Sequence, residues 1–320
     1  DVTKTPFYTA PMSRGLVPED NAVSFQGARS TAMREADFVL VVGTRLNWMM
    51  QYGQRFAQDA KIVQIDIDGR ELGHNRNIDL GIQADAKAAM GQLLAEAEAR
   101  EGEFADRLES DWVIHLREDN DRRAEQSAPL LNSDAQPIHP LRLCKEIREF
   151  LDRDAIVSVD GNEILHFGRQ SIPTNVPGHR LNSGVTGTMG VGLPYGIGAQ
   201  LAKPDAQVLV LHGDGSMGQN AMEIDTAVRH NLPVVTVISN NAGWTARTPG
   251  QRKPGRELGF TAYHKMAESL GAYGEEVTDP AEIKPALDRA YSSGKAAVIN
   301  VIVEPTAAGV SRAWGGSRME

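Results

Sequence analysis

The fold of this chain is decided by residues 208–245, which read VLVLHGDGSMGQNAMEIDTAVRHNLPVVTVISNNAGWT. Residues 208–212 and 234–239 are short apolar runs typical of strands buried on both faces, and the segment between them favours a helix. The first strand is followed by Gly-Asp-Gly-Ser and the second by Asn-Asn. Because the carboxyl ends of parallel strands meet at one edge of a sheet, we expect these polar residues to line a ligand site there.

The residues after these strands suit a phosphate group together with a divalent cation. Gly213 and Gly215 let the backbone turn sharply and approach an anion, while the amino end of the next helix faces it. The side-chain oxygens of Asp214 and Asn241, with one backbone carbonyl, are ligands that Mg²⁺ prefers. A tight structural turn would explain Gly-Asp-Gly alone. The two motifs together, each after a strand, favour a site that binds diphosphate and magnesium as one unit.

Length and composition exclude several classes of protein. The 320 residues, 41% hydrophobic and 23% charged, are typical of a soluble globular protein with room for about two domains. A net charge of −9 without a long basic run argues against a nucleic-acid partner, and no apolar stretch is long enough for a membrane span. The single cysteine, Cys144, excludes a disulfide within the chain and favours a reducing, cytoplasmic location.

The alternation of strands and helices predicts an α/β fold with two doubly wound parallel-sheet domains. We expect a Rossmann-like domain at residues 1–126, a linker at 127–136, a diphosphate- and metal-binding domain at 137–305 and a tail or lid at 306–320. Further predicted strands are residues 38–43, 61–67, 155–159 and 297–303, and the strand at 208–212 is expected to begin at residue 207. The predicted helices are residues 84–100, 140–151, 190–202, 220–230 and 281–292.

The order and spacing of the two motifs resemble the cofactor-binding motif of thiamine diphosphate enzymes, which include decarboxylases and acetolactate synthases. The resemblance implies that the chain binds thiamine diphosphate and Mg²⁺. The implied metal ligands are Asp214, Asn241 and the carbonyl of Gly243. The groups implied to hold the diphosphate are Gly213, the Ser216 hydroxyl and the amides of Gly215, Trp244 and Thr245.

Two further turns match the same family. Residues 187–190, Gly-Thr-Met-Gly, resemble the turn that holds the cofactor bent, which implies cofactor contacts from Gly187, Thr188 and Met189. In that turn the large apolar residue lies between the two cofactor rings, whereas Met189 taken alone would be a core residue. The second turn, which the resemblance assigns to the diphosphate, contains Gly161, Asn162 and Glu163, although many relatives have different residue types there.

The first domain resembles one branch of the family, the 2-hydroxyacyl-CoA lyases and oxalyl-CoA decarboxylases. The signals are residues 11–15, Pro-Met-Ser-Arg-Gly, and above all residues 41–48, Val-Val-Gly-Thr-Arg-Leu-Asn-Trp. In this branch the middle domain holds the ADP end of coenzyme A, so the resemblance implies that Arg45 and Asp66 contact it. A surface salt bridge is the alternative for Arg45. The tail resembles a lid in which Arg312 faces the thioester arm of CoA.

The resemblance implies a carbon–carbon lyase that cleaves a 2-hydroxyacyl-CoA to formyl-CoA and an aldehyde or ketone. Oxalyl-CoA decarboxylases generally have a tyrosine shortly after the asparagine pair, where this chain has Thr245, and the loop at 248–259 is polar. Glu257 in that loop is the predicted general base, with a solvated surface charge as the alternative. Oxalyl-CoA decarboxylation is the alternative reaction. A non-catalytic CoA- or ADP-binding fragment is the alternative from another class of protein.

Enzymes of this family complete their sites with an N-terminal pyrimidine-binding domain, whose glutamate activates the cofactor, and with a second subunit. This chain begins at Asp1, without a methionine and partway through the middle domain. We therefore expect a fragment of a longer enzyme, or one polypeptide of a split enzyme, that works as a homodimer or homotetramer. The expected substrate is an acyl-CoA.

Overall fold

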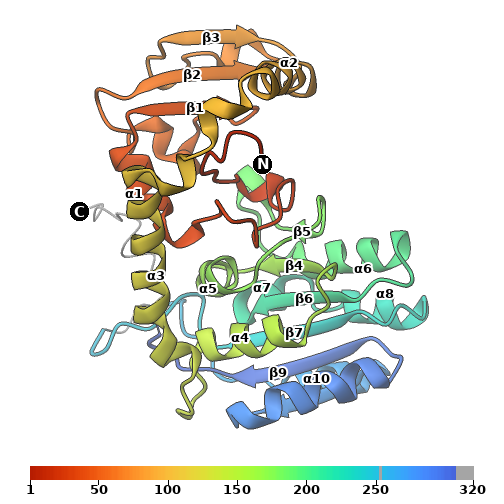
Figure 1. Ribbon diagram of the computed structural model, residues 1–320. Helices are drawn as coiled ribbons and strands as arrows, with labels where there is room; N and C mark the ends of the chain where they lie inside the picture. The colour runs from red at the N-terminus through yellow and green to blue at the C-terminus, as the bar shows by residue number, and fades with distance from the viewer. Residues whose placement is uncertain (252–253, 308–320) are drawn as a thin grey trace. The chain divides into compact units, whose positions relative to one another are not determined.

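The computed structural model describes residues 1–251 and 254–307, and the chain divides into two compact units (Figure 1). The first unit contains Asp1–Ala10 and Asn21–Gln126, and the second contains Pro11–Asp20 and the chain from Ser127 onward. Each unit is built on a parallel β-sheet, so the predicted α/β class with two parallel sheets is confirmed. None of the described helices combines the length and the apolar composition needed to cross a membrane.

The first unit has a three-stranded sheet in the order β1-β2-β3. The structure has two strands and a helix within two residues of the bounds predicted for them, 38–43, 61–67 and 84–100. Strand β3 was not predicted, because its sequence, Leu-Gly-Ile-Gln, is not a continuous apolar run. The strands are β1 (Phe38–Val42), β2 (Lys61–Asp66) and β3 (Leu80–Gln83), and the helices are α1 (Arg29–Glu35), α2 (Ala86–Ala99) and α3 (Asp111–Leu131), which runs past the end of the unit. Short 3₁₀ turns are η2 (Gln26–Ala28), η3 (Trp48–Gly53), η4 (Gly69–Glu71), η5 (Glu101–Phe104) and η6 (Arg107–Glu109).

The second unit has a six-stranded parallel sheet in the order β5-β4-β6-β7-β9-β8. Its strands are β4 (Ile156–Asp160), β5 (Arg180–Leu181), β6 (Val208–Gly213), β7 (Val235–Asn240), β8 (Tyr273–Val277) and β9 (Ala297–Ile302). Its helices are α4 (Pro140–Phe150), α5 (Glu163–Ser171), α6 (Gly192–Ala202), α7 (Asp214–Asn220), α8 (Glu223–Arg229), α9 (Tyr263–Ser269) and α10 (Ile283–Ser292). Short 3₁₀ turns are η1 (Pro11–Ser13), η7 (Gly184–Thr186) and η8 (Pro280–Glu282).

Apolar side chains alternate between the two faces of this sheet, which explains why helices cover both. On β6, Leu209 and Leu211 belong to a buried cluster with residues of α4, α5 and α10, whereas Val208 and Val210 belong to a cluster with residues of α6, α8 and α9. Successive residues of a strand point to opposite faces, so a continuous apolar run indicates a strand that is covered on both sides. The doubly wound arrangement predicted for this domain is therefore present.

Two segments differ from the prediction. Residues 127–136, expected to be a linker, begin as helix because α3 continues to Leu131, which packs against an apolar cluster of the second unit. The helix expected at residues 220–230 is α8, within three residues of its predicted bounds, and it is preceded by a further helix, α7, that was not predicted and begins at Asp214. Buried Met217 packs α7 against the core, so tertiary packing makes a helix of a glycine-containing segment whose propensity favours a turn.

The carboxyl ends of the central strands lie level with one another. Asp160, the last residue of β4, pairs with His212 of β6, and Gly213 at the end of β6 pairs with Ser239 of β7. The turns that follow these strands therefore meet at one edge of the sheet, as the two motifs predicted.

Candidate functional site

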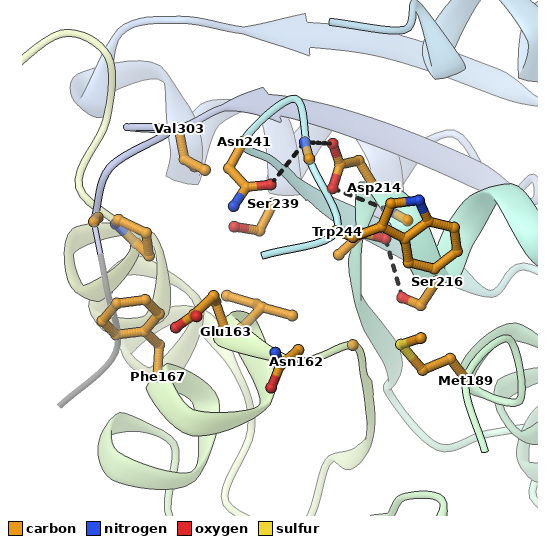
Figure 2. A pocket seen from close by; sticks show the side chains of 17 residues that line it. Asn162, Glu163, Phe167, Met189, Asp214, Ser216, Ser239, Asn241, Trp244 and Val303 are labelled. Atoms are coloured by element: carbon orange, nitrogen blue, oxygen red, sulfur yellow. Dashed lines mark hydrogen bonds between the residues drawn. The ribbon is translucent and has the colours of Figure 1, made fainter. Parts of the chain in front are cut away.

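A pocket lies at this edge of the sheet, among the turns that follow β4, β6 and β7 (Figure 2). Apolar residues also line it, among them Phe167 of α5 and Val303, which follows β9. The structure brings together most of the residues predicted to hold a cofactor. Those that line the pocket are Gly161, Asn162, Glu163, Met189, Gly213, Asp214, Gly215, Ser216, Asn241, Gly243 and Trp244, whereas Gly187, Thr188 and Thr245 do not.

The backbone amide of Gly243 brings the side chains of Asp214 and Asn241 together. Gly243 N lies 2.8 Å from Asp214 Oδ2 and 3.2 Å from Asn241 Oδ1, so these two predicted metal ligands converge from different strands (Figure 2). Asp214 Oδ1 accepts a second hydrogen bond, from Gly215 N at 2.9 Å. Within the described residues, Gly243 O accepts no hydrogen bond. Two side-chain oxygens of the kinds that Mg²⁺ prefers are thus grouped beside the Gly243 backbone, whose carbonyl is the third predicted ligand.

The burial of Asp214 makes this point suited to a cation. Asp214 is only 2% exposed. Burial raises the pKa of Asp214 to about 6, although the amides of Gly215 and Gly243 oppose the rise. A bound divalent cation offsets the cost of burying the carboxylate. The described residues contain no group of three or more His, Cys, Asp or Glu side chains that could hold a metal. The residues present therefore fit a magnesium ion that is shared with a phosphate, rather than a metal held by protein side chains alone.

Trp244 packs over the turn that begins α7. A Cβ added at Gly215 would lie 2.7 Å from Trp244 Cε3, so this close approach requires glycine. The Trp244 amide donates to Arg256 O at 3.0 Å, which ties the loop after β7 to a segment farther along the chain. The half-buried indole therefore forms a wall of the pocket beside Asp214 (Figure 2).

The Ser216 hydroxyl belongs to a buried hydrogen-bond network at the edge of the pocket. It lies 3.0 Å from Asp160 O, 3.0 Å from Gly213 O and 2.9 Å from His212 Nδ1. Burial lowers the pKa of His212 to about 3, so the imidazole is neutral at physiological pH. Ser216 thus supports the turn itself, and its contact with a diphosphate stays a prediction.

The turn at residues 187–190 presents Met189 to the pocket. Met189 is half-buried and lines the pocket, and it belongs to none of the buried apolar clusters of the described chain. Gly187 and Gly190 have φ angles of +63° and +90°, which glycine adopts without strain. This placement favours contact with a ligand over the alternative of a core residue.

The two residues predicted to contact coenzyme A lie in the first unit, after neighbouring strands. Arg45 follows β1, is 63% exposed and forms a salt bridge with Glu71 at 3.2 Å. Asp66 ends β2, and its Oδ1 accepts a hydrogen bond from Asp68 N at 2.9 Å. The salt bridge of Arg45 matches the structural alternative stated for that residue, and Asp66 caps the turn that follows β2. Contact of Arg45 and Asp66 with coenzyme A stays a prediction.

The predicted base, Glu257, is not among the residues that line the pocket. Glu257 is exposed and pairs with Gly243 in an isolated antiparallel bridge, so its segment is attached to the turn at residues 241–243. Arg312, together with residues 252 and 253 of the same loop as Glu257, lies outside the described residues.

Asn300 supports the turn that contains the predicted metal ligands Asn241 and Gly243, and it was not identified from the sequence. Asn240 Nδ2 donates to Asn300 Oδ1 at 3.1 Å, and Asn240 Oδ1 accepts from Ala242 N at 3.2 Å. The turn needs this support because Ala242 has a φ of +58°, an uncommon value for a residue other than glycine. Asn240 belongs to the Asn-Asn motif. The only sign of Asn300 in the sequence is that a single amide side chain interrupts the apolar run of β9.

Comparisons with known proteins agree with this site. The family model described as thiamine pyrophosphate enzyme, C-terminal TPP binding domain, matches residues 165–301, and the one described as thiamine pyrophosphate enzyme, central domain, matches residues 1–93. A probable acetolactate synthase of Mycobacterium bovis is 33% identical over 93% of this chain and 54% of its own length.

Two other relatives carry different names. A 2-hydroxyacyl-CoA lyase of Arabidopsis thaliana is 33% identical over 96% of this chain and 56% of its own length. An oxalyl-CoA decarboxylase of Escherichia coli is 31% identical over 94% of this chain and 54% of its own length. The chain therefore spans about half the length of the curated relatives it matches.

Proposed function

Since the chain carries the central and C-terminal domains of the thiamine pyrophosphate enzymes, we propose that it binds thiamine diphosphate and Mg²⁺ in the pocket at the ends of β4, β6 and β7. The observation that supports this most directly is the convergence of Asp214 Oδ2 and Asn241 Oδ1 on Gly243 N. In the proposed complex, these two oxygens and Gly243 O bind Mg²⁺. The pocket turns at residues 161–163 and 213–216 contact the diphosphate, and Met189 contacts the rings.

We further propose that the complete enzyme is a carbon–carbon lyase that acts on a 2-hydroxyacyl-CoA. When bound, thiamine diphosphate supplies a nucleophilic carbon and a ring that holds the electrons released as a bond beside a carbonyl breaks. Cleavage of the C1–C2 bond releases an aldehyde or ketone from C2, with loss of the hydroxyl proton. The C1 carbon gains a proton and leaves as formyl-CoA.

Two features support the lyase over its alternatives. Residues 41–48 resemble the CoA-binding branch of the family, and Thr245 occupies the place near which oxalyl-CoA decarboxylases generally have tyrosine. The sequence identities to the lyase, the decarboxylase and the acetolactate synthase are nearly equal, so oxalyl-CoA decarboxylation stays the second candidate.

Formation of formyl-CoA from a 2-hydroxyacyl-CoA, with no CO₂ from oxalyl-CoA, would support the lyase. The opposite pattern, or acetolactate from pyruvate, would refute it. The assay uses an assembly that includes a pyrimidine-binding domain and a second subunit, the proposed partners.

Glu257 is the proposed general base for the substrate hydroxyl. Its segment pairs with Gly243, which binds the metal in the proposed complex, so Glu257 belongs to a part of the chain that is attached to the proposed cofactor site. We expect Glu257→Gln to lower kcat about 100-fold with little change in cofactor affinity, because general-base catalysis contributes about 10²–10⁴-fold. Steady-state rates and cofactor titrations measure both quantities. An unchanged kcat would remove Glu257 from the mechanism.

Trp244 offers a direct test of cofactor binding. We expect thiamine diphosphate with Mg²⁺ to quench the fluorescence of this indole, which lines the pocket, and Trp244→Phe to remove most of the change. Trp112, in the first unit, provides the matched control, since Trp112→Phe should leave the quenching intact. Calorimetric titration measures binding independently. A chain that binds no thiamine diphosphate, even with the pyrimidine-binding domain supplied, would favour the non-catalytic CoA- or ADP-binding alternative.

A further inference from the structure

The turn that presents Met189 is held by the buried carboxylate of Asp160. Asp160 Oδ2 accepts a hydrogen bond from Gly192 N at 2.8 Å, and the backbone amides of Gly190 and Val191 also act to lower the pKa of this carboxyl. Asp160 is 3% exposed, so its carboxylate has exchanged water for the amides at the start of α6. Burial raises the pKa of Asp160, and these amides oppose the rise. The hydrogen bonds therefore offset the cost of burying the carboxylate.

The same turn is held on its other side by Asn220. Asn220 Nδ2, at the last residue of α7, donates to Gly190 O at 2.7 Å. A Cβ added at Gly190 would lie 2.9 Å from Gln219 Cβ and 3.0 Å from Asn220 Nδ2. The turn thus lies directly against the end of α7, with a hydrogen bond at the carbonyl of Gly190 and another, from Asp160, at the amide of Gly192.

These contacts connect the Met189 turn to the diphosphate end of the pocket. Asp160 O accepts a hydrogen bond from the Ser216 hydroxyl at 3.0 Å, so the same residue contacts the first turn of α7. Asn220 ends the helix that Asp214 begins, and a seven-residue helix is roughly 10 Å long. The distance from the metal-binding residue to the Met189 turn is therefore set by one short helix with a hydrogen bond at each end.

We propose that Asp160 and Asn220 are positioning residues that clamp residues 190–192 and thereby hold Met189 against the rings of bound thiamine diphosphate. The proposal rests on the proposed cofactor. Asp160 and Asn220 need not touch the cofactor, since they act through the turn. Inorganic diphosphate with Mg²⁺ would occupy only the end of the pocket near Asp214, and its binding does not depend on Met189.

The clamp is tested first in the cofactor-free chain by hydrogen–deuterium exchange. Asn220 is exposed, so Asn220→Ala should fold normally, and Asp160→Asn is the second variant. We expect the amides of residues 190–192 to exchange about tenfold faster in both variants, with little change in the strands of the sheet. Gln219→Ala is the matched control, because Gln219 lies against Gly190 without the hydrogen bond of Asn220. Unchanged exchange at residues 190–192 in Asn220→Ala would overturn the clamp.

The positioning role is tested second by comparing two ligands in the presence of Mg²⁺. We expect Asn220→Ala to weaken thiamine diphosphate about tenfold, or about 1.4 kcal/mol, and to leave the affinity for inorganic diphosphate unchanged. Equal weakening of both ligands, or of neither, would overturn the positioning role. A wild-type chain that binds neither ligand, with the pyrimidine-binding domain supplied, would refute the proposed function instead, and the exchange measurement would still decide whether the clamp exists.

Discussion

Asp214→Asn is expected to abolish the Mg²⁺-dependent binding of thiamine diphosphate and to leave the metal-free protein at least as stable as the wild type. The carboxylate supplies the negative charge among the proposed metal ligands, and Asn241 and Gly243 supply only neutral oxygens. Removing that charge from a hard-cation site should weaken binding at least 100-fold, or roughly 2.7 kcal/mol. Calorimetric titration with and without Mg²⁺ measures the loss.

The expected stability follows from the pKa of the same residue. Burial raises the pKa of Asp214 from 3.8 to about 6 in the folded chain, so the folded state binds the proton more tightly than the unfolded state. Protonated Asp214 therefore stabilises the folded state below about pH 3.8. This stabilisation is lost as the pH rises through about 6, which costs on the order of 3 kcal/mol at neutral pH. Asparagine has no such charge to bury. It loses one acceptor for a backbone amide, at a cost of roughly 1 kcal/mol.

Chemical denaturation at pH 5 and pH 8 tests this expectation. The wild-type free energy of unfolding should fall relative to that of Asp214→Asn as the pH rises between these values. Asp225→Asn is the matched control, because Asp225 is partly exposed in the same unit and forms only a surface ion pair with Arg229. Retention of Mg²⁺-dependent affinity in Asp214→Asn would contradict the assignment of this carboxylate to the metal.

The placement of Asp214 and Asn241 at one edge of the sheet could be predicted from the sequence, because their positions depend on local pattern. Asp214 and Asn241 each follow a continuous apolar run, and parallel strands bring such positions together whatever the rest of the chain does. The same reasoning found β4, β6, β7 and β9 and four helices of the second unit, but not the short strand β5 or the helices α5, α7 and α9. It missed β8, whose sequence Tyr-Gly-Glu-Glu-Val contains a glycine and two charged residues that disfavour a strand.

The support of the site could not be predicted, because it depends on contacts between distant elements. Asp160 reaches Gly192, 32 residues away, and Asn240 reaches Asn300, 60 residues away. No periodic pattern in the sequence relates the two residues of such a pair. The approach of Trp244 to Gly215 is likewise a product of packing, since either residue alone is compatible with many turns. The sequence pattern therefore predicts which functional groups lie at the edge of the sheet, and packing between distant elements determines how rigidly those groups are held.

Gly196→Ala is expected to lower the free energy of unfolding by about 1–3 kcal/mol, although alanine favours helices over glycine by about 1 kcal/mol. Gly196 is where α6 crosses the sheet, and a Cβ there would lie 2.2 Å from Val210 Cγ2 and 3.2 Å from Val234 Cγ2. Both valines are fully buried, and their branched side chains have little rotamer freedom. Relief of the clash therefore requires α6 to move away from β6.

Two further variants separate the clash from the change in helix propensity. Gly198→Ala, in the same helix with open space around the added Cβ, should stabilise the protein by roughly 0.5–1 kcal/mol. Because residues 196 and 210 are in contact, Val210→Ala should be less destabilising in the Gly196→Ala background than in the wild type. The free energy of unfolding of the double variant should therefore be higher than the sum of the two single effects predicts. Thermal and denaturant unfolding measure these values. Because α6 begins at Gly192, which donates to Asp160, displacement of the helix should also weaken thiamine diphosphate binding in Gly196→Ala. Equal stabilities of the two glycine variants would contradict this account of how α6 is placed.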